Sequence, residues 1–99
     1  MSKFVLSPEA QLSLKQIKSY SIKQFRTARA NRYLNEILLA FRALVENPDM
    51  GRNSDELMSG YCSYFVGPHT IYYRIKPDLI EVIDVLYQSM EPTIVLPES

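Results

Sequence analysis

Two turn signals divide the second half of the sequence and limit how it can fold. Gly67-Pro68 and Pro77-Asp78 separate three runs rich in aromatic and β-branched residues, at 61–66, 69–76 and 79–87. Such residues favour strands, and proline is tolerated mainly at strand ends and edges. We therefore predict three strands joined by two tight turns, which form an antiparallel meander.

A two-residue loop at Pro77-Asp78 would decide which residues of the last two strands face each other. The expected pairs are Ile75 with Ile80, Arg74 with Glu81, Tyr73 with Val82, and Ile71 with Asp84. A longer loop would shift all of these partners. Asp84 lies in an otherwise apolar run, and a buried carboxylate requires a partner. We expect this partner to be Arg74 or a basic residue of the preceding helices.

The first half of the sequence predicts a short strand and two helices. Residues 3–6 are the strand, and Ser7-Pro8-Glu9 supplies an N-cap, a proline suited to the first helical position and an acidic first turn. We predict a first helix to about Phe25. Apolar residues at three- and four-residue spacing predict a second helix from Ala30 to Asn47-Pro48. The short span between them favours an antiparallel helical hairpin.

Residues 49–60 contain Gly, Asn and Ser with little periodicity, and we predict a loop there. The expected element order is β-α-α-β-β-β. This is an α+β fold in which the helical hairpin packs on a small, mainly antiparallel sheet. A length of 99 residues suits a single domain, residues 1–99. Residues 88–99 are expected to be either an ordered extension or a frayed end.

The composition excludes several classes of site. Because Cys62 and His69 are the only residues of their types, the chain cannot close an internal disulfide or assemble a Cys/His zinc site by itself. There is no glycine-rich phosphate loop, so no cofactor is expected, and no metal. No apolar run is long enough for a signal peptide or a membrane span. We expect a soluble, cytoplasmic protein without a membrane partner.

The formal net charge is zero, but the charges are segregated along the chain. Residues 10–35 include six basic and no acidic residues, whereas residues 77–99 include five acidic and no basic ones. Both sets could be ordinary solvated faces. Alternatively, a basic hairpin faces an acidic partner or nucleic acid, although the sequence does not show that the six charges share one surface.

Two residues suggest local chemistry. His69 follows the Gly67-Pro68 turn and could transfer protons, but an exposed or packed histidine is the commoner case, and no carboxylate obviously orients it. Cys62 has no basic neighbour in the sequence that would lower its pKa. We interpret Cys62 as a small apolar residue of a strand and not as a nucleophile.

The order of elements and several local motifs together resemble ParE toxins of the RelE/ParE superfamily. The motifs are Asn47-Pro48 with Gly51-Arg52 after the second helix, and the closing segment Val85-Leu86 with Met90. The resemblance spans nearly the whole chain. It implies a β-α-α-β-β-β fold and a type II toxin neutralised by a cognate ParD-like antitoxin. It also implies that the toxin poisons DNA gyrase by binding it and performs no chemistry itself.

A second branch of the superfamily, the RelE-like toxins, is similar in fold and implies ribosome-dependent cleavage of mRNA. Tyr87 stands where many relatives carry histidine, and Cys62 lies near a position often occupied by arginine. Both departures favour the ParE branch, because cleavage needs groups that stabilise developing charge. If the protein is a ribonuclease, the candidate residues are Arg52, His69, Arg74 and Tyr87. Arginines and a proton-transfer group in one concave pocket with Tyr87 would contradict the non-enzymatic interpretation.

The resemblance also implies that a flexible antitoxin segment wraps the helical hairpin and folds as it binds. Leu12, Ile22 and Leu39 lie off the main apolar stripes and are candidates for antitoxin contact. They could equally be scattered surface apolar residues. We expect no direct sequence-specific binding of nucleic acid. An inactive relative that retains antitoxin binding is a third possibility.

Overall fold

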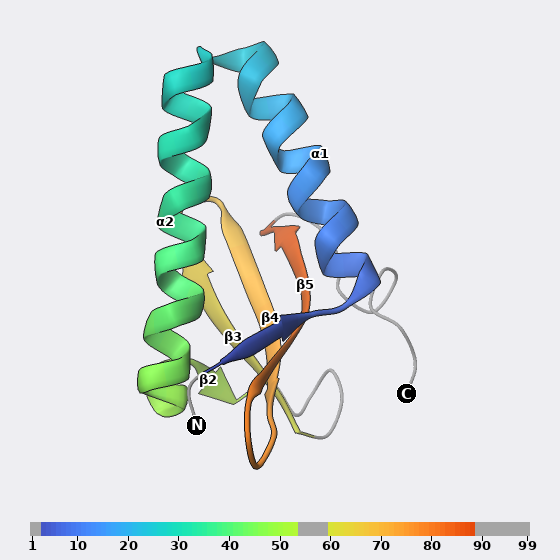
Figure 1. Cartoon of the computed structure of the whole chain (residues 1–99), viewed down its shortest axis with the longest axis vertical. Helices are drawn as coiled ribbons and strands as arrows, with labels where there is room; N and C mark the ends of the chain where they lie inside the picture. Colours follow the sequence, from blue (N-terminus) through green and yellow to red (C-terminus); the bar gives the residue numbers. More distant parts are fainter. Residues whose placement is uncertain (1–2, 54–59, 89–99) are drawn as a thin grey trace.

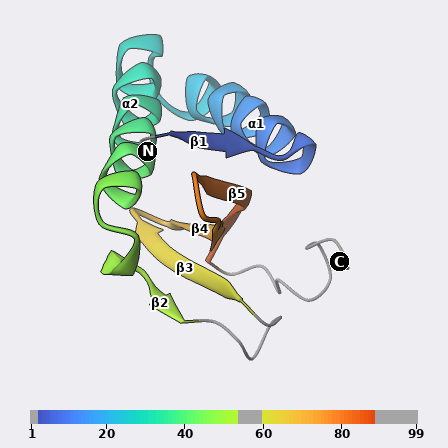
Figure 2. The same cartoon turned by 60° about the horizontal axis from the view of Figure 1, so that its bottom comes forward.

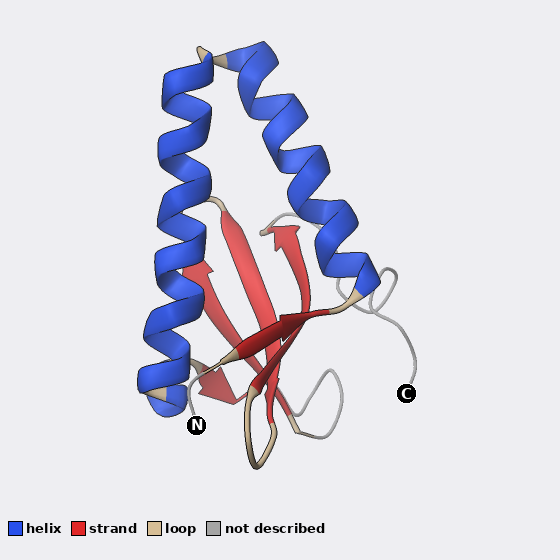
Figure 3. Ribbon diagram, in the orientation of Figure 1, coloured by secondary structure: helices blue, strands red, loops and turns tan. Residues whose placement is uncertain are grey.

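Two helices cover one face of a five-stranded sheet in the computed structural model, which describes residues 3–53 and 60–88 (Figures 1 and 2). The helices are α1 (Pro8–Gln24) and α2 (Thr27–Glu46). The strands are β1 (Phe4–Leu6), β2 (Arg52–Asn53), β3 (Tyr61–Val66), β4 (His69–Ile75) and β5 (Ile80–Tyr87). Their spatial order is β1-β5-β4-β3-β2, and only β1 pairs in parallel, with β5. The predicted α+β fold is confirmed (Figure 3).

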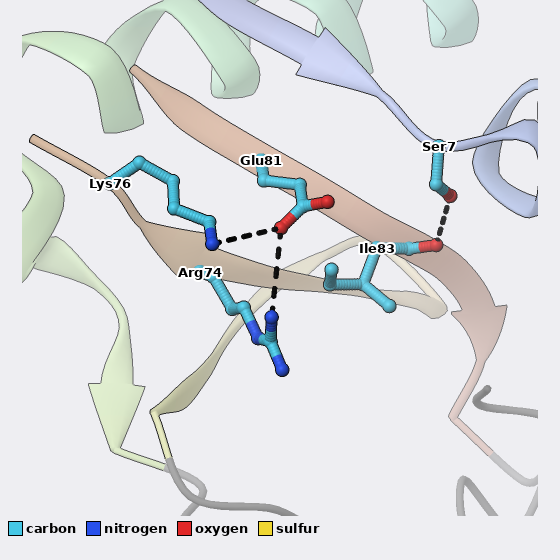
Figure 4. Close-up of polar contacts among 5 residues, drawn as sticks. All are labelled: Ser7, Arg74, Lys76, Glu81 and Ile83. Carbon is cyan, nitrogen blue, oxygen red and sulfur yellow. Dashed lines mark hydrogen bonds and ion pairs between the residues drawn. The ribbon is translucent and has the colours of Figure 1, made fainter. Parts of the chain in front are cut away.

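The junction between β1 and α1 forms as the sequence predicts. The Ser7 side chain accepts a hydrogen bond from the Ala10 amide, and Pro8 occupies the first turn. The Ser7 hydroxyl also donates to the Ile83 carbonyl at 2.5 Å (Figure 4), and the Ser7 amide donates to the Val82 carbonyl. Ser7 therefore caps the helix and ties it to β5. The helix ends at Gln24, one residue before the predicted Phe25.

The second helix begins three residues earlier than predicted, at Thr27, and the connection shrinks to Phe25 and Arg26. Apolar periodicity marks only the part of a helix that faces the core, and no breaker separates Arg26 from Ala30. The helix can therefore extend back into solvent. It ends at Glu46, as expected from the Pro48 that follows.

The predicted loop at 49–60 is wrong in its first part. Residues Pro48–Met50 form a short 3-10 helix, η1, and β2 then pairs with β3. The Tyr73 hydroxyl donates to the Pro48 carbonyl at 2.8 Å, and a Cβ on Gly51 would collide with this hydroxyl and with the backbone of Ser63. A buried tyrosine in a distant strand therefore orders the segment, which local composition could not reveal. Residues 54–59 lie outside the described residues.

The predicted meander is confirmed, and the first three predicted pairs of β4 and β5 are correct. The fourth is wrong, because an irregularity at Ile83 places Asp84 opposite Tyr72 and Val85 opposite Ile71. A bulge inserts one extra residue and changes the direction of the side chains beyond it. Here it brings the Asp84 side chain to α1.

The main core lies between the helices and the sheet. Ile37, Phe41 and Leu44 of α2 are fully buried against Ile71 and Val82 of the sheet. Burial of such side chains stabilises a fold by roughly 1.5–3 kcal/mol each. Neither α1 nor α2 is long and apolar enough to cross a membrane, and the described ranges contain no other α-helix. Residues 89–99, most of the predicted tail, lie outside the described residues.

Candidate functional site

A groove of about 740 Å³ lies between the two helices and the ends of β4 and β5. We call it the hairpin groove. Both helices continue past the end of the sheet to their connection, as Figure 1 shows. The apolar lining includes Ile17 of α1, Ala30 of α2 and Val85 of β5. The mixture of apolar, aromatic and charged side chains that line the groove is typical of binding sites.

Tyr33 joins α2 to the turn between β3 and β4. Its hydroxyl oxygen lies 2.6 Å from His69 Nδ1 and 3.0 Å from the Val66 carbonyl oxygen. A carbonyl can only accept, and the hydroxyl has one proton, so both contacts are satisfied when Tyr33 donates to Val66 and His69 donates to Tyr33. We therefore assign the neutral Nδ1–H tautomer to His69. Its Nε2 is then the nitrogen available to accept a proton.

The turn itself requires glycine at position 67. Gly67 has a φ of +54°, and a Cβ there would meet the Tyr33 ring at 3.2 Å. Only glycine adopts this conformation without strain while leaving room for the ring. The turn that precedes His69 thus also accommodates Tyr33.

His69 lines the hairpin groove and contacts two tyrosines. Its ring stacks on Tyr87, with centroids 5.0 Å apart and planes at 21°, and lies 5.6 Å from the Tyr33 ring. Burial lowers the pKa of His69 below its usual value, so the ring is neutral at pH 7. Burial, Glu36 and Tyr87 raise the pKa of Tyr33 to about 12, so its hydroxyl keeps its proton.

Two arginines of α2 also line the hairpin groove. Arg29 and Arg32 are exposed, and the Arg29 guanidinium lies 4.4 Å from the centroid of the Phe25 ring. Arginines, His69 and Tyr87 therefore share one concave surface. By the expectation drawn from the sequence, this arrangement would contradict a non-enzymatic toxin. It supports a ribonuclease as the second candidate function.

The four candidate ribonuclease residues are not brought together. His69 and Tyr87 are in contact, but Arg52 lies in β2, and neither Arg52 nor Arg74 lines the hairpin groove. Arg74 lies 5.1 Å from the centroid of the Tyr61 ring.

Arg74 also faces Glu81, as the register predicts. The Glu81 Oε1 atom lies 4.0 Å from an Arg74 nitrogen and 3.9 Å from Lys76 Nζ (Figure 4). These long ion pairs on partly exposed side chains contribute little to stability.

Asp84 has a different partner from the one expected. Its carboxylate accepts hydrogen bonds from the Ser13 hydroxyl at 2.5 Å and from the Val85 amide at 2.8 Å, and neither group is basic. Burial raises the pKa of Asp84, and the two hydrogen bonds counteract part of that rise. The bulge explains the difference, because it directs Asp84 to α1 and away from Arg74.

The candidate antitoxin contacts are exposed. Leu12 and Ile22 lie on α1 and Leu39 on α2, with exposed fractions of 57%, 37% and 53%. They are therefore not core residues, and their contact with an antitoxin stays a prediction. Cys62 is a partly buried residue of β3. Among residues 3–53 and 60–88, no group of three His, Cys, Asp or Glu residues could hold a metal ion.

Sequence reasoning missed three residues of the hairpin groove, Arg29, Arg32 and Tyr33. Tyr33 lies three residues after Ala30, at the apolar spacing that predicts the second helix, and this spacing indicates packing in the core. The signal that could have identified Tyr33 is its hydroxyl group. From a half-buried position, this group can form hydrogen bonds with a neighbouring turn. The arginines belong to the basic run at 10–35, which does not itself indicate a shared face.

The chain matches known proteins along most of its length. Residues 4–92 match the family model of the ParE toxin of the type II toxin-antitoxin system parDE. Toxin ParE1 is 35% identical over 91 residues, in both Mycobacterium tuberculosis strain CDC 1551 / Oshkosh and strain ATCC 25618 / H37Rv. These 91 residues cover 91% of this chain and 93% of each relative.

Two solved structures share the fold. A chain of the chromosomal ParDE TA system from P. aeruginosa superposes with a TM-score of 0.76 at 15% identity, covering 88% of this chain and 96% of that one. A chain of the toxin-antitoxin complex RelBE2 from Mycobacterium tuberculosis superposes with a TM-score of 0.66 at 18% identity, covering 88% of this chain and 98% of that one. At these identities the likeness concerns the fold alone. Taken with the family match, these findings show that the chain belongs to the ParE family of type II toxin-antitoxin toxins.

Proposed function

We propose that this toxin poisons DNA gyrase by binding it in the cytoplasm, and that a cognate ParD-like antitoxin neutralises it. The observation that carries the proposal is the family match over residues 4–92. In this account the toxin breaks no bond itself. It traps gyrase with cleaved DNA, and this requires only a stable binding surface.

A supercoiling assay tests the target. Purified gyrase is incubated with relaxed plasmid, ATP and micromolar toxin, and the plasmid forms are separated by electrophoresis. We expect supercoiling to fall with toxin concentration and to recover when antitoxin is added. Unaltered supercoiling at micromolar toxin would count against gyrase as the target.

For the antitoxin we propose contact with Leu12, Ile22 and Leu39. Exposed apolar side chains on a helical surface suit an amphipathic segment that folds as it binds. The solved relatives come from a ParDE system and a RelBE2 complex, which supports a partner of this kind.

The double variant Leu12→Ser, Ile22→Ser tests this surface. It should weaken antitoxin binding in calorimetry and leave the unfolding midpoint nearly unchanged, because both side chains are exposed. Ile17→Ser, on the same helix but buried, is the matched control and should lower the midpoint. A large loss of stability in the double variant would show that Leu12 and Ile22 belong to the core.

The hairpin groove favours one second candidate, a ribosome-dependent endoribonuclease. Neutral His69, with Nε2 able to accept a proton, could act as a general base, and Arg29 and Arg32 could stabilise a phosphate. This arrangement is the one that contradicts the non-enzymatic interpretation. Arg52 and Arg74 do not line the groove, however, and the family match over residues 4–92 keeps gyrase poisoning first.

Primer extension on mRNA from cells that express the toxin distinguishes the two functions. Position-specific cleavage that disappears with His69→Gln would establish the ribonuclease. Intact message during growth arrest would support gyrase poisoning.

A further inference from the structure

We propose that the tip of the helical hairpin binds the phosphate backbone of DNA without reading its sequence. The tip is defined here by Arg26, Arg29 and Arg32, which surround the connection between α1 and α2. The inference goes beyond the proposed function, because it assigns a DNA contact to the toxin itself.

The three arginines share one surface, which the sequence alone could not show. Arg26 is the N-cap residue of α2, and Arg29 and Arg32 follow at three-residue steps. All three are exposed, and they line one shallow concavity of about 580 Å³ together with Gln24 and Phe25. Three cations at one projecting end can contact neighbouring phosphates together.

Nothing in the described part of the chain neutralises this charge. Within residues 3–53 and 60–88, no carboxylate forms an ion pair with Arg26, Arg29 or Arg32. The first acidic residue of α2 is Glu36, which lines the hairpin groove together with Arg29 and Arg32 but forms no ion pair with either of them. The guanidinium groups are therefore available to an anionic partner.

The positions of these arginines oppose the stability of α2. The start of a helix carries a partial positive charge and favours acidic residues and a side-chain cap. Instead, α2 has Arg26 as its N-cap without a side-chain cap, and its first turn contains no acidic residue. By contrast, Lys23 in the last turn of α1 is placed favourably. Residues that violate a local rule in this way often serve a function.

The chemistry of the tip suits phosphate better than an acidic protein segment. Arginine binds phosphate oxygens through two parallel hydrogen bonds. A protein interface usually buries an apolar centre, but among the described residues that line the tip concavity the only large apolar one is Phe25, and the Arg29 guanidinium lies over its ring. The tip therefore presents charge with little apolar surface, as non-specific DNA binding requires.

The distribution of charge would also orient the molecule. Asp78 belongs to the turn between β4 and β5, while Glu46 and Asp49 lie at and just after the end of α2. In Figure 1 these segments lie at the opposite end of the molecule from the connection between the helices. That end also carries Lys76 and Arg52, so its charges offset one another, whereas residues 10–35, which include the tip, contain no acidic residue. The field of DNA would therefore attract the tip first.

The test measures binding of the full chain to a fluorescein-labelled DNA duplex of about 20 base pairs by fluorescence anisotropy, without gyrase. If three arginines each neutralise one phosphate, log K should fall with log[salt] at a slope of about −2.7. This corresponds to a loss of about 40-fold between about 50 and about 200 mM salt. Affinity should not depend on the sequence of the duplex.

Arg26→Gln, Arg29→Gln and Arg32→Gln should each reduce the magnitude of the slope by about 0.9. Arg42→Gln is the matched control, because Arg42 is an exposed arginine in the second half of α2. This variant should show the same salt dependence of DNA binding as the original protein. Circular dichroism confirms that each variant folds.

The absence of DNA binding at low salt would overturn the proposal. The same holds if the three tip variants bind as the original protein does, or if only Arg42→Gln weakens binding. If the tip variants bind DNA normally but fail to inhibit gyrase, the tip contacts protein and the proposal is wrong. Since the binding assay contains no gyrase, its outcome is independent of the proposed target.

Discussion

At the scale of single residues, two ionisable groups, half-buried His69 and buried Asp84, lie where the helices meet the sheet. Burial lowers the pKa of His69, and Asp84 accepts hydrogen bonds from Ser13 and Val85. Each group has a pKa displaced by folding. Each therefore makes stability depend on pH, but in a different range.

For His69, burial lowers the pKa in the folded state below the unfolded value of about 6.5. The folded state thus binds the proton less readily, and the stability contribution is full above pH 6.5 and is lost as pH falls towards the folded pKa. Urea titrations at several pH values should show this loss. His69→Gln should remove this part of the pH dependence, and an unchanged profile would show that His69 does not cause it.

For Asp84, burial raises the folded pKa above the usual value. The folded state therefore favours the protonated form, so the contribution to stability is largest at acidic pH and is lost as pH rises through the folded pKa. Asp84→Asn removes the buried charge and keeps an oxygen that can accept from Ser13 and Val85. We expect this variant to gain stability relative to the original at pH 7 but not at pH 3. The opposite order would show that the charge itself stabilises the contact.

At the scale of the elements, the start of α2 is a weak point of the hairpin. Arg26 has the extended backbone of an N-cap, with φ −99° and ψ 160°, but makes no capping hydrogen bond. Arg26→Ser supplies a hydroxyl that can accept from the first turn, and should stabilise the protein by about 1 kcal/mol.

Thermal unfolding measures this gain. Arg26→Gln, which removes the charge without adding a good cap, separates capping from electrostatics. If Arg26→Ser and Arg26→Gln are stabilised equally, the gain in stability comes from the lost charge alone. If the proposed DNA contact is also correct, Arg26→Ser becomes more stable while it binds DNA less tightly, a common exchange at functional sites.

The sequence predicts elements whose signals are local, and it misses features that depend on distant contacts. The three strands and their turns follow from Gly67-Pro68 and Pro77-Asp78, and the first helix follows from Ser7-Pro8. In contrast, β2 depends on Tyr73, which lies 25 residues after Pro48 in the chain and orders the segment through its hydrogen bond to the Pro48 carbonyl.

The candidate site also combines residues with local signals and contacts between distant parts of the chain. His69 and Tyr87 could be named from the sequence as single residues, but not as a stacked pair. Their contact depends on the register of β4 and β5, which places them opposite each other. The hydrogen bond between Tyr33 and His69 forms only when α2 packs on the sheet, and no local motif specifies this packing.

At the scale of the whole molecule, the fold presents three surfaces, two of which overlap. The hairpin groove contains His69 and Tyr87, and it shares Arg29 and Arg32 with the basic tip, which projects beyond the sheet. Leu12, Ile22 and Leu39 are exposed on the helices and line neither of them. Because the exposed apolar residues lie outside the groove and the tip, an antitoxin and a target can bind different parts of one small domain. In this account toxicity requires binding alone.

The most direct measurement is the amount of linear plasmid formed when purified gyrase, relaxed plasmid and ATP are incubated with the toxin and then denatured with detergent. Gyrase poisoning predicts that linear DNA accumulates as toxin increases, and that it does not form when gyrase is omitted. The absence of linear DNA, together with position-specific cleavage of ribosome-bound message by the same preparation, would contradict the account and identify the hairpin groove as a ribonuclease site.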